Sequence, residues 1–145
     1  MSRSPRLAVR GILVREGRVL MVNAFAGSDA LWCLPGGGVE AGADLADNLV
    51  REVFEETGLR VTVGDLAHVS EFADPDTGFH QVELFFHVEA EGDVVDTIDP
   101  VVSHRGWFDA ARLAALPHKP DTISALAFGP RGPATCAPLS RMVRV

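Results

Sequence analysis

Three carboxylates in this chain are spaced so that they could bind one cation together. Glu55 and Glu56 follow Glu52 by three and four residues. In an α-helix these side chains share one side, roughly 5–6 Å from their neighbours, where like charges repel. Mg²⁺ would remove the repulsion, because it takes oxygen ligands and often joins protein carboxylates to substrate phosphates. The spacing therefore indicates a metal site.

A glycine run lies shortly before the three glutamates. Gly36, Gly37 and Gly38 follow Pro35, and residues without a Cβ let the backbone come close to a ligand. Each feature alone is weak, since an acidic helix face is usually just a solvated surface. Their joint occurrence at short spacing favours one site over two unrelated features.

The glutamates need a helix with defined ends. Asp44 is suited to the N-cap position and Asp47 to the first turn, where acids complement the helix dipole. Gly58 is a typical C-terminal stop. An apolar stripe along the segment predicts one buried face; it consists of Leu45, Ala46, Leu49, Val50, Val53 and Phe54.

The remaining pattern predicts a single α+β domain over residues 1–145, with a mixed sheet and helices on its faces. We expect a β-hairpin from two apolar runs, a loop, a short extended piece, and later strands around a turn. These segments are 7–14, 18–24, 25–30, 31–34, 60–70, 74–78 (the turn), 81–90 and 104–108. Residues 91–100 are expected to form a loop, 110–116 and 121–128 short helices, and 129–145 an irregular tail.

Composition excludes several classes of function. The net charge of −7 argues against binding of a nucleic-acid polymer, which needs a basic surface. No apolar run is long enough to span a membrane. Two cysteines, Cys33 and Cys136, form no metal-binding motif and fit a reducing cytoplasm, although one long-range disulfide is compatible with the sequence. We expect a cytoplasmic protein without a membrane partner.

The segment from Gly37 to Leu59 resembles the Nudix box. The opening glycine of that pattern falls on Gly37, and its continuous second half matches Arg51, Glu52, Val53, Glu55, Glu56, Gly58 and Leu59. The early glutamate of the pattern falls on Ala43, beside Asp44. The Leu34-Pro35 lead-in and the Trp107-Phe108 pair also resemble the family's usual surroundings.

The resemblance implies an α/β/α sandwich with a central mixed sheet and a hydrolase that cleaves the pyrophosphate of a nucleoside diphosphate linked to another group. It implies that Glu52, Glu55, Glu56 and the Gly36 carbonyl bind Mg²⁺ or Mn²⁺. Glu52 is our first candidate for the acceptor of the attacking water's proton, and Glu55 the second. Arg51 is expected to orient the glutamates. Gly37 and Gly38 are expected to face the substrate.

Ala43 leaves a second hypothesis open. We expect Asp44 or Glu40 to replace the missing acid, but some family members with an incomplete box bind nucleotides without cleaving them. The chain could then be a nucleotide-binding or regulatory module. For an enzyme, Pro75 resembles a marker of the ADP-ribose-cleaving branch, yet a turn alone explains this proline. A nucleoside triphosphate is an equal alternative.

Other residues have two interpretations each. Trp32 and Phe25 could stack on a base, or belong to the core, as most aromatic residues do. His80, His87 and His104 have no metal-ligand spacing, so packing or surface roles are expected. Glu83 lies on a predicted strand with an undetermined orientation, and apolar strand edges allow a homodimer.

Overall fold

The computed structural model describes residues 4–25, 28–93 and 104–141 and contains two sheets. The first sheet has the strand order β10-β6-β7-β1-β5, with β11 also on β6; the second has the order β2-β3-β4-β9, with β8 on β3. The first sheet comprises β1 (Arg6–Ile12), β5 (Gly36–Gly38), β6 (Val61–Asp74), β7 (Phe79–Ala90), β10 (Thr135–Cys136) and β11 (Ser140–Arg141). The second comprises β2 (Val14–Arg15), β3 (Arg18–Phe25), β4 (Ser28–Cys33), β8 (Arg105–Phe108) and β9 (His118–Lys119).

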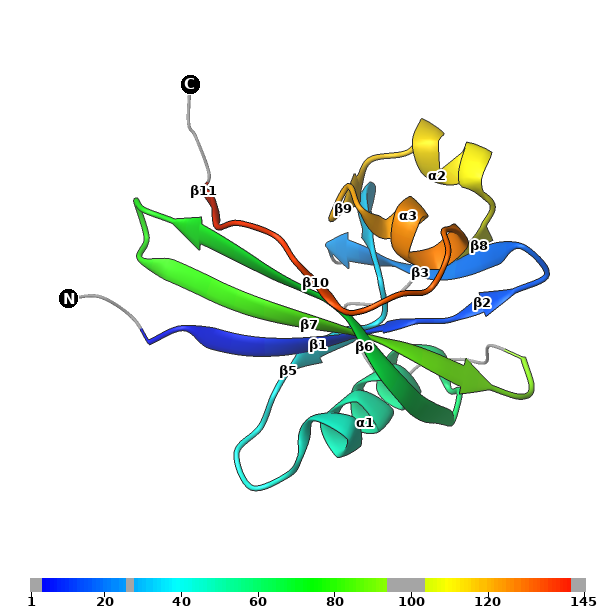
Figure 1. Ribbon diagram of the computed structural model, residues 1–145, viewed down its shortest axis with the longest axis horizontal. Helices are drawn as coiled ribbons and strands as arrows, with labels where there is room; N and C mark the ends of the chain where they lie inside the picture. Colours follow the sequence, from blue (N-terminus) through cyan, green and yellow to red (C-terminus); the bar gives the residue numbers. More distant parts are fainter. Residues whose placement is uncertain (1–3, 26–27, 94–103, 142–145) are drawn as a thin grey trace.

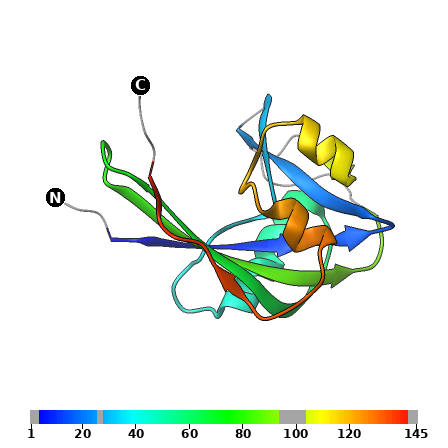
Figure 2. The ribbon, with the colours of Figure 1, turned by 45° about the horizontal axis from the view of Figure 1, so that its top comes forward.

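Three helices complete a sandwich around the first sheet. Helix α1 (Leu45–Thr57) covers one side, while α2 (Ala110–Ala115) and α3 (Ile123–Phe128) lie on the other with the second sheet (Figure 1). Figure 2 shows α1 and α3 on opposite sides of β1 and β7. Because β1 runs parallel to β7 and antiparallel to β5, the sheet is mixed. The predicted fold class is confirmed.

The first predicted hairpin is only partly correct. Strand β1 pairs with β5 and β7, and only Val14 and Arg15 pair with β3. The chain therefore changes sheets at Leu13, which is buried. The strand contributes to both cores, since Val9 faces the α1 side and Ile12 the other. The expected loop at residues 25–30 is also too long, because β4 begins at Ser28.

Strands β6 and β7 form a long antiparallel hairpin in the first sheet (Figure 1). Its turn lies where the sequence predicts it. Gly78 N–H donates to Asp74 O at 2.9 Å, and Asp76 N–H donates to Asp74 Oδ1 at 3.0 Å. The strand expected at residues 60–70 continues through the bulged register to Asp74. Residues 94–100 of the expected loop lie outside the described residues.

The expectation of an irregular tail was wrong for two short segments. Strands β10 and β11 pair with β6 in parallel, Thr135 opposite His68 and Ser140 opposite Phe72. An unpaired sheet edge exposes backbone donors and acceptors, and the tail strands pair with some of those on β6. The side chains add a bond of 2.6 Å between His68 Nδ1 and Thr135 Oγ1. Residues 142–145 are outside the described range.

Helix α1 forms as its sequence predicts. Asp44 caps it through its carboxylate, which accepts from Asp47 N–H at 2.7 Å, and Gly58 ends it in the left-handed conformation with φ 75°. Leu49 and Val53 are fully buried against the first sheet. Asp109 caps α2 in the same way, accepting from Arg112 N–H at 2.8 Å. No helix in the described part of the chain is long and apolar enough to cross a membrane.

Candidate active site

The glycine turn is pressed between β1 and α1. Gly36 has φ 152°, and a Cβ there would lie 2.0 Å from Val9 O, so only glycine fits. A Cβ on Gly37 would lie 2.5 Å from Glu52 Oε2. The absence of side chains at both positions therefore brings the turn within contact of a helix carboxylate.

Hydrogen bonds hold the turn from two sides. On the β1 side, Arg10 Nη1 donates to Leu34 O (3.3 Å) and Gly11 N–H donates to Pro35 O (2.9 Å). On the α1 side, Gly36 N–H donates to Glu56 Oε1 at 2.6 Å. Antiparallel pairs alternate between bonded and non-bonded, so Gly36 falls in a non-bonded pair with Arg10. That alternation directs the Gly36 carbonyl away from β1, toward the outer edge of the sheet.

Arg51 binds the carboxylates on the surface of α1. Its Nη1 lies 3.1 Å from Glu52 Oε1, 3.4 Å from Glu55 Oε1 and 3.8 Å from Glu40 Oε1. Glu52 is the more enclosed carboxylate of the helix pair, with 15% of its side chain exposed against 32% for Glu55. Arg51 thus contacts both groups, and its role in orienting them stays a prediction.

Burial raises the pKa of the Glu52 carboxyl above its ordinary value, and the neighbouring Glu55 raises it further. The charge of Arg51 acts in the opposite direction. Glu56 is more enclosed still, at 6% exposed, and its carboxylate receives the Gly36 amide. The helix therefore presents carboxylates that gain from a nearby cation, because their charge is poorly solvated.

Asn48, which the sequence interpretation missed, closes the loop around Ala43. Its Oδ1 accepts from Glu40 N–H at 2.9 Å, and its Nδ2 donates to Asp44 O (2.8 Å) and Ala43 O (3.2 Å). Ala43 itself is exposed. Of the two expected substitutes for an acid there, Asp44 caps the helix and Glu40 reaches Arg51. An Asn next to Leu49, within the apolar stripe of the predicted helix, was the available signal.

The donor set fits a hard divalent cation, although it is not a preformed cage. Among the described residues, no three Asp, Glu, His or Cys side chains converge as a ready metal cluster. Mg²⁺ does not require one, since it commonly uses one or two carboxylates together with substrate phosphates and water. The oxygens of Glu52, Glu55, Glu56 and the Gly36 carbonyl are chemically suitable. Arg51 would have to release Glu52 and Glu55 for both to bind the ion.

Two arginines of β1 provide cations next to the turn. Arg10 forms a largely enclosed ion pair with Glu83 of β7, Nε to Oε2 3.0 Å, and this contact settles the orientation of Glu83. The guanidinium of Arg6 lies against Gly38, 2.4 Å from where a Cβ would stand. Arg6 is exposed. A charged residue inside the apolar pattern of the predicted strand 7–14 was the signal for Arg10, whereas Arg6 lies just before that segment.

Other singled-out residues lie away from this turn or serve the core. Trp32 is 4% exposed and packs on Phe108 at 4.9 Å between ring centroids. Phe25 is 55% exposed at the end of β3. Among the histidines, His80 Nε2 lies 3.7 Å from Glu71 Oε1, His104 N–H donates to Asn23 Oδ1, and His87 lines a separate cavity. None of these residues joins the glutamates of α1.

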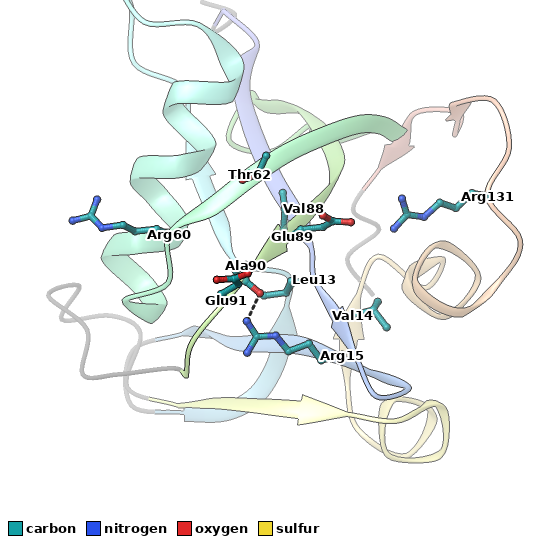
Figure 3. A pocket seen from close by; sticks show the side chains of 10 residues that line it. All are labelled: Leu13, Val14, Arg15, Arg60, Thr62, Val88, Glu89, Ala90, Glu91 and Arg131. Carbon is teal, nitrogen blue, oxygen red and sulfur yellow. Dashed lines mark hydrogen bonds between the residues drawn. The ribbon is translucent and has the colours of Figure 1, made fainter.

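One hollow of the described structure is lined by no residue of the box. It measures about 680 Å³ and is lined by Arg15, Arg60, Arg131 and Glu89, with residues of β2, β6 and β7 (Figure 3). Arg15 is tied to the carbonyls of Ala90 and Gly92. In Figure 3, Arg60 and Arg131 extend from opposite sides of the hollow. A smaller cavity of about 310 Å³ lies between β6, β7 and α3.

Comparison with known proteins gives one family. A model of the NUDIX domain matches residues 4–127. An ADP-ribose pyrophosphatase of Methanocaldococcus jannaschii is 36% identical over 116 residues, covering 77% of this chain and 66% of that protein. The protein YjhB of Bacillus subtilis (strain 168) is 30% identical over 132 residues, covering 86% of this chain and 60% of its own length. The chain thus spans less than two thirds of these relatives.

A solved structure agrees with this result. The crystal structure of a MutT NUDIX hydrolase from Burkholderia pseudomallei has a TM-score of 0.73 and 28% sequence identity, covering 86% of this chain and 97% of that one. The similarity in sequence and in fold therefore extends over most of the chain, beyond the 23-residue segment of the box.

Proposed function

Since this chain belongs to the NUDIX domain family, we propose that it is a metal-dependent hydrolase that cleaves the pyrophosphate bond of a nucleoside diphosphate linked to another group. The observation that carries the proposal is the contact between a glycine turn and the enclosed carboxylates of α1. Glu56 receives the Gly36 amide at 2.6 Å, and Glu52 lies against Gly37. Clustered, partly desolvated acids beside an open backbone suit a cation that binds phosphate.

The residues divide into distinct roles in this proposal. Glu52, Glu55, Glu56 and the Gly36 carbonyl hold Mg²⁺ or Mn²⁺. When bound, the ion would supply positive charge for the phosphate oxygens and would lower the pKa of a bound water. Glu52 is the first candidate for accepting that water's proton and Glu55 the second. Arg51 orients both carboxylates, to which it lies within 3.4 Å.

Phosphate binding needs cations from the protein as well. Of the β1 arginines, Arg10 is engaged with Glu83 and Leu34. Arg6 is exposed beside Gly38, and in the described residues it has no carboxylate within ion-pair distance. We assign it to a phosphate of the substrate, next to the backbone of Gly37 and Gly38. This local positive charge offsets the net charge of −7.

ADP-ribose is the first substrate candidate because the Methanocaldococcus jannaschii relative is an ADP-ribose pyrophosphatase. Pro75 adds no support, since it lies exposed in the turn between β6 and β7. A nucleoside triphosphate remains the alternative substrate. The competing class is a module that binds nucleotides without cleaving them, which the alanine at position 43 keeps open.

The deciding experiment is product analysis with Mg²⁺ or Mn²⁺ on ADP-ribose and on a deoxynucleoside triphosphate. AMP with ribose phosphate identifies the first substrate, and pyrophosphate with a monophosphate identifies the second. Glu55→Gln should abolish either reaction. Glu71→Gln, an exposed carboxylate of the β6–β7 hairpin, should not. If the parent protein binds these nucleotides but releases no product, the non-hydrolysing module is correct and the hydrolase proposal is wrong.

A further inference from the structure

One guanidinium links β7 to the turn that carries Gly36. Arg10 Nε donates to Glu83 Oε2 at 3.0 Å, and its Nη1 donates to Leu34 O at 3.3 Å. Only 15% of the Arg10 side chain and 14% of the Glu83 side chain are exposed. Buried ion pairs are weak contributors to stability because desolvation offsets their attraction. The pair therefore calls for a role beyond holding the sheet together.

The contacts of Arg10 and its neighbour form an ordered series. Arg10 binds the carbonyl of Leu34, and Gly11 N–H binds the next carbonyl, that of Pro35. The following residue, Gly36, points the other way and donates its N–H to Glu56. With two successive carbonyls fixed on β1, the Gly36 peptide has little freedom to rotate. The direction of its N–H and C=O then depends on Arg10.

Glu83 in turn fixes Arg10. It lies two residues before Phe85 on the same face of β7, and Phe85 is the register partner of Arg10. Phe85 is fully buried in the core between the sheet and α3. Glu83 thus binds Arg10 from a rigid strand, whereas the glutamates of α1 share a half-buried arginine.

We propose that Arg10 and Glu83 are positioning residues that orient the Gly36 peptide and, through it, the carboxylate of Glu56. This inference rests on the proposed hydrolase function. Arg10 directs its Nε to Glu83 and its Nη1 to Leu34, so we assign its action to the turn and not to substrate binding. The pair then determines the rate of the chemical step, and substrate affinity is left nearly unchanged.

Arginine is required by this geometry. Two different nitrogens of one planar group reach Glu83 and Leu34 at the same time. A lysine offers a single nitrogen on a flexible stem and cannot fix both partners in one plane. Arg10→Lys keeps the charge and should still fail to hold the Leu34 carbonyl.

The experiment compares Arg10→Lys with the double variant Arg10→Met/Glu83→Leu. The double variant removes both charges together, so it leaves no unpaired buried charge and should fold. The matched control is Glu71→Gln, which removes a carboxylate of a surface pair on the same hairpin. Each protein is measured for kcat and KM, and for hydrogen exchange of the Gly36 and Gly11 amides by NMR.

We expect both Arg10 variants to lower kcat by about 10- to 100-fold, the usual effect of losing a residue that orients a metal ligand. KM should change less than about twofold. The Gly36 amide should exchange at least about tenfold faster, and the control should match the parent. Unchanged kcat and Gly36 exchange in the double variant would overturn the proposal, as would a change in KM alone. If the parent cleaves nothing, the hydrolase proposal fails, while the exchange rates still test the positioning role.

Discussion

The two sides of the glycine turn carry ionic clusters of opposite character. On the α1 side, Arg51 is shared among Glu52, Glu55 and Glu40 at 3.1–3.8 Å, and 32% of its side chain is exposed. On the β1 side, Arg10 has one carboxylate partner at 3.0 Å and is 15% exposed. Near water a shared cation can change partners at little cost. A buried pair cannot separate without leaving a poorly solvated charge.

This difference suggests that the α1 cluster takes part in the proposed reaction, while the Arg10 cluster holds the glycine turn in place. If Glu52 and Glu55 hold the proposed metal ion, the ion must displace Arg51 from them, so those contacts have to be weak. The turn that meets them must stay in place during that exchange, so its anchor on Arg10 has to be strong. Four predictions test this comparison, in order of decreasing expected effect.

Glu52→Gln should lower kcat by about 10²–10⁴-fold if Glu52 accepts the proton of the attacking water. The substitution keeps the shape of the side chain against Gly37 and removes its basicity. Steady-state kinetics under saturating Mg²⁺ measure the loss, with Glu55→Gln as the comparison. A larger loss in Glu55→Gln would give the role of proton acceptor to Glu55.

Arg10→Ala should destabilise the protein by about 3–5 kcal/mol, because it leaves Glu83 buried without its cation. The corresponding change on the other side, Arg51→Ala, should cost about 0–1 kcal/mol. Urea unfolding of the two variants and the parent gives both values. Equal losses would remove the distinction between a fixed and an exchangeable cluster.

His68 is a buried titratable residue outside the box, and we expect it to affect the stability of the fold but not catalysis. Burial lowers the pKa of this imidazole below its ordinary value. The unfolded chain therefore binds a proton more readily than the folded one, and stability falls as pH drops through about 6.5 toward the folded pKa.

His68→Gln should make the unfolding free energy less dependent on pH between 5 and 7.5. Urea unfolding at several pH values measures this slope. The kcat at neutral pH should stay near that of the parent, because no box residue contacts His68. A slope equal to that of the parent would show that His68 is not responsible for it.

Ala43→Glu should have the smallest effect, within about 0.5 kcal/mol on stability, as is usual for an exposed position. Position 43 is exposed, and Asn48 already binds the carbonyl of Ala43 at 3.2 Å. Thermal unfolding and kcat of the variant give the comparison with the parent. A large gain in kcat would mean that the loop in the parent is poorly organised despite Asn48.

Much of the fold follows from local patterns, and long-range pairing explains the errors. The hairpin expected from 7–14 and 18–24 has the right strand segments, but β1 pairs with β7, more than seventy residues away. Apolar alternation predicts that a strand exists and gives no information on which strand it joins. The tail strands were missed for the same reason, since β10 is short and forms only on the edge of β6.

The site also combines features set by local contacts with features set by long-range contacts. The sequence by itself determined α1, because its cap at Asp44, its end at Gly58 and the spacing of Glu52, Glu55 and Glu56 depend on contacts within four residues. Only the tertiary structure decided that Glu56 meets Gly36, that Asn48 closes the loop and that Arg10 pairs with Glu83, 73 residues away. The helix depends on the local spacing of residues, whereas partners across a sheet depend on how the whole chain packs.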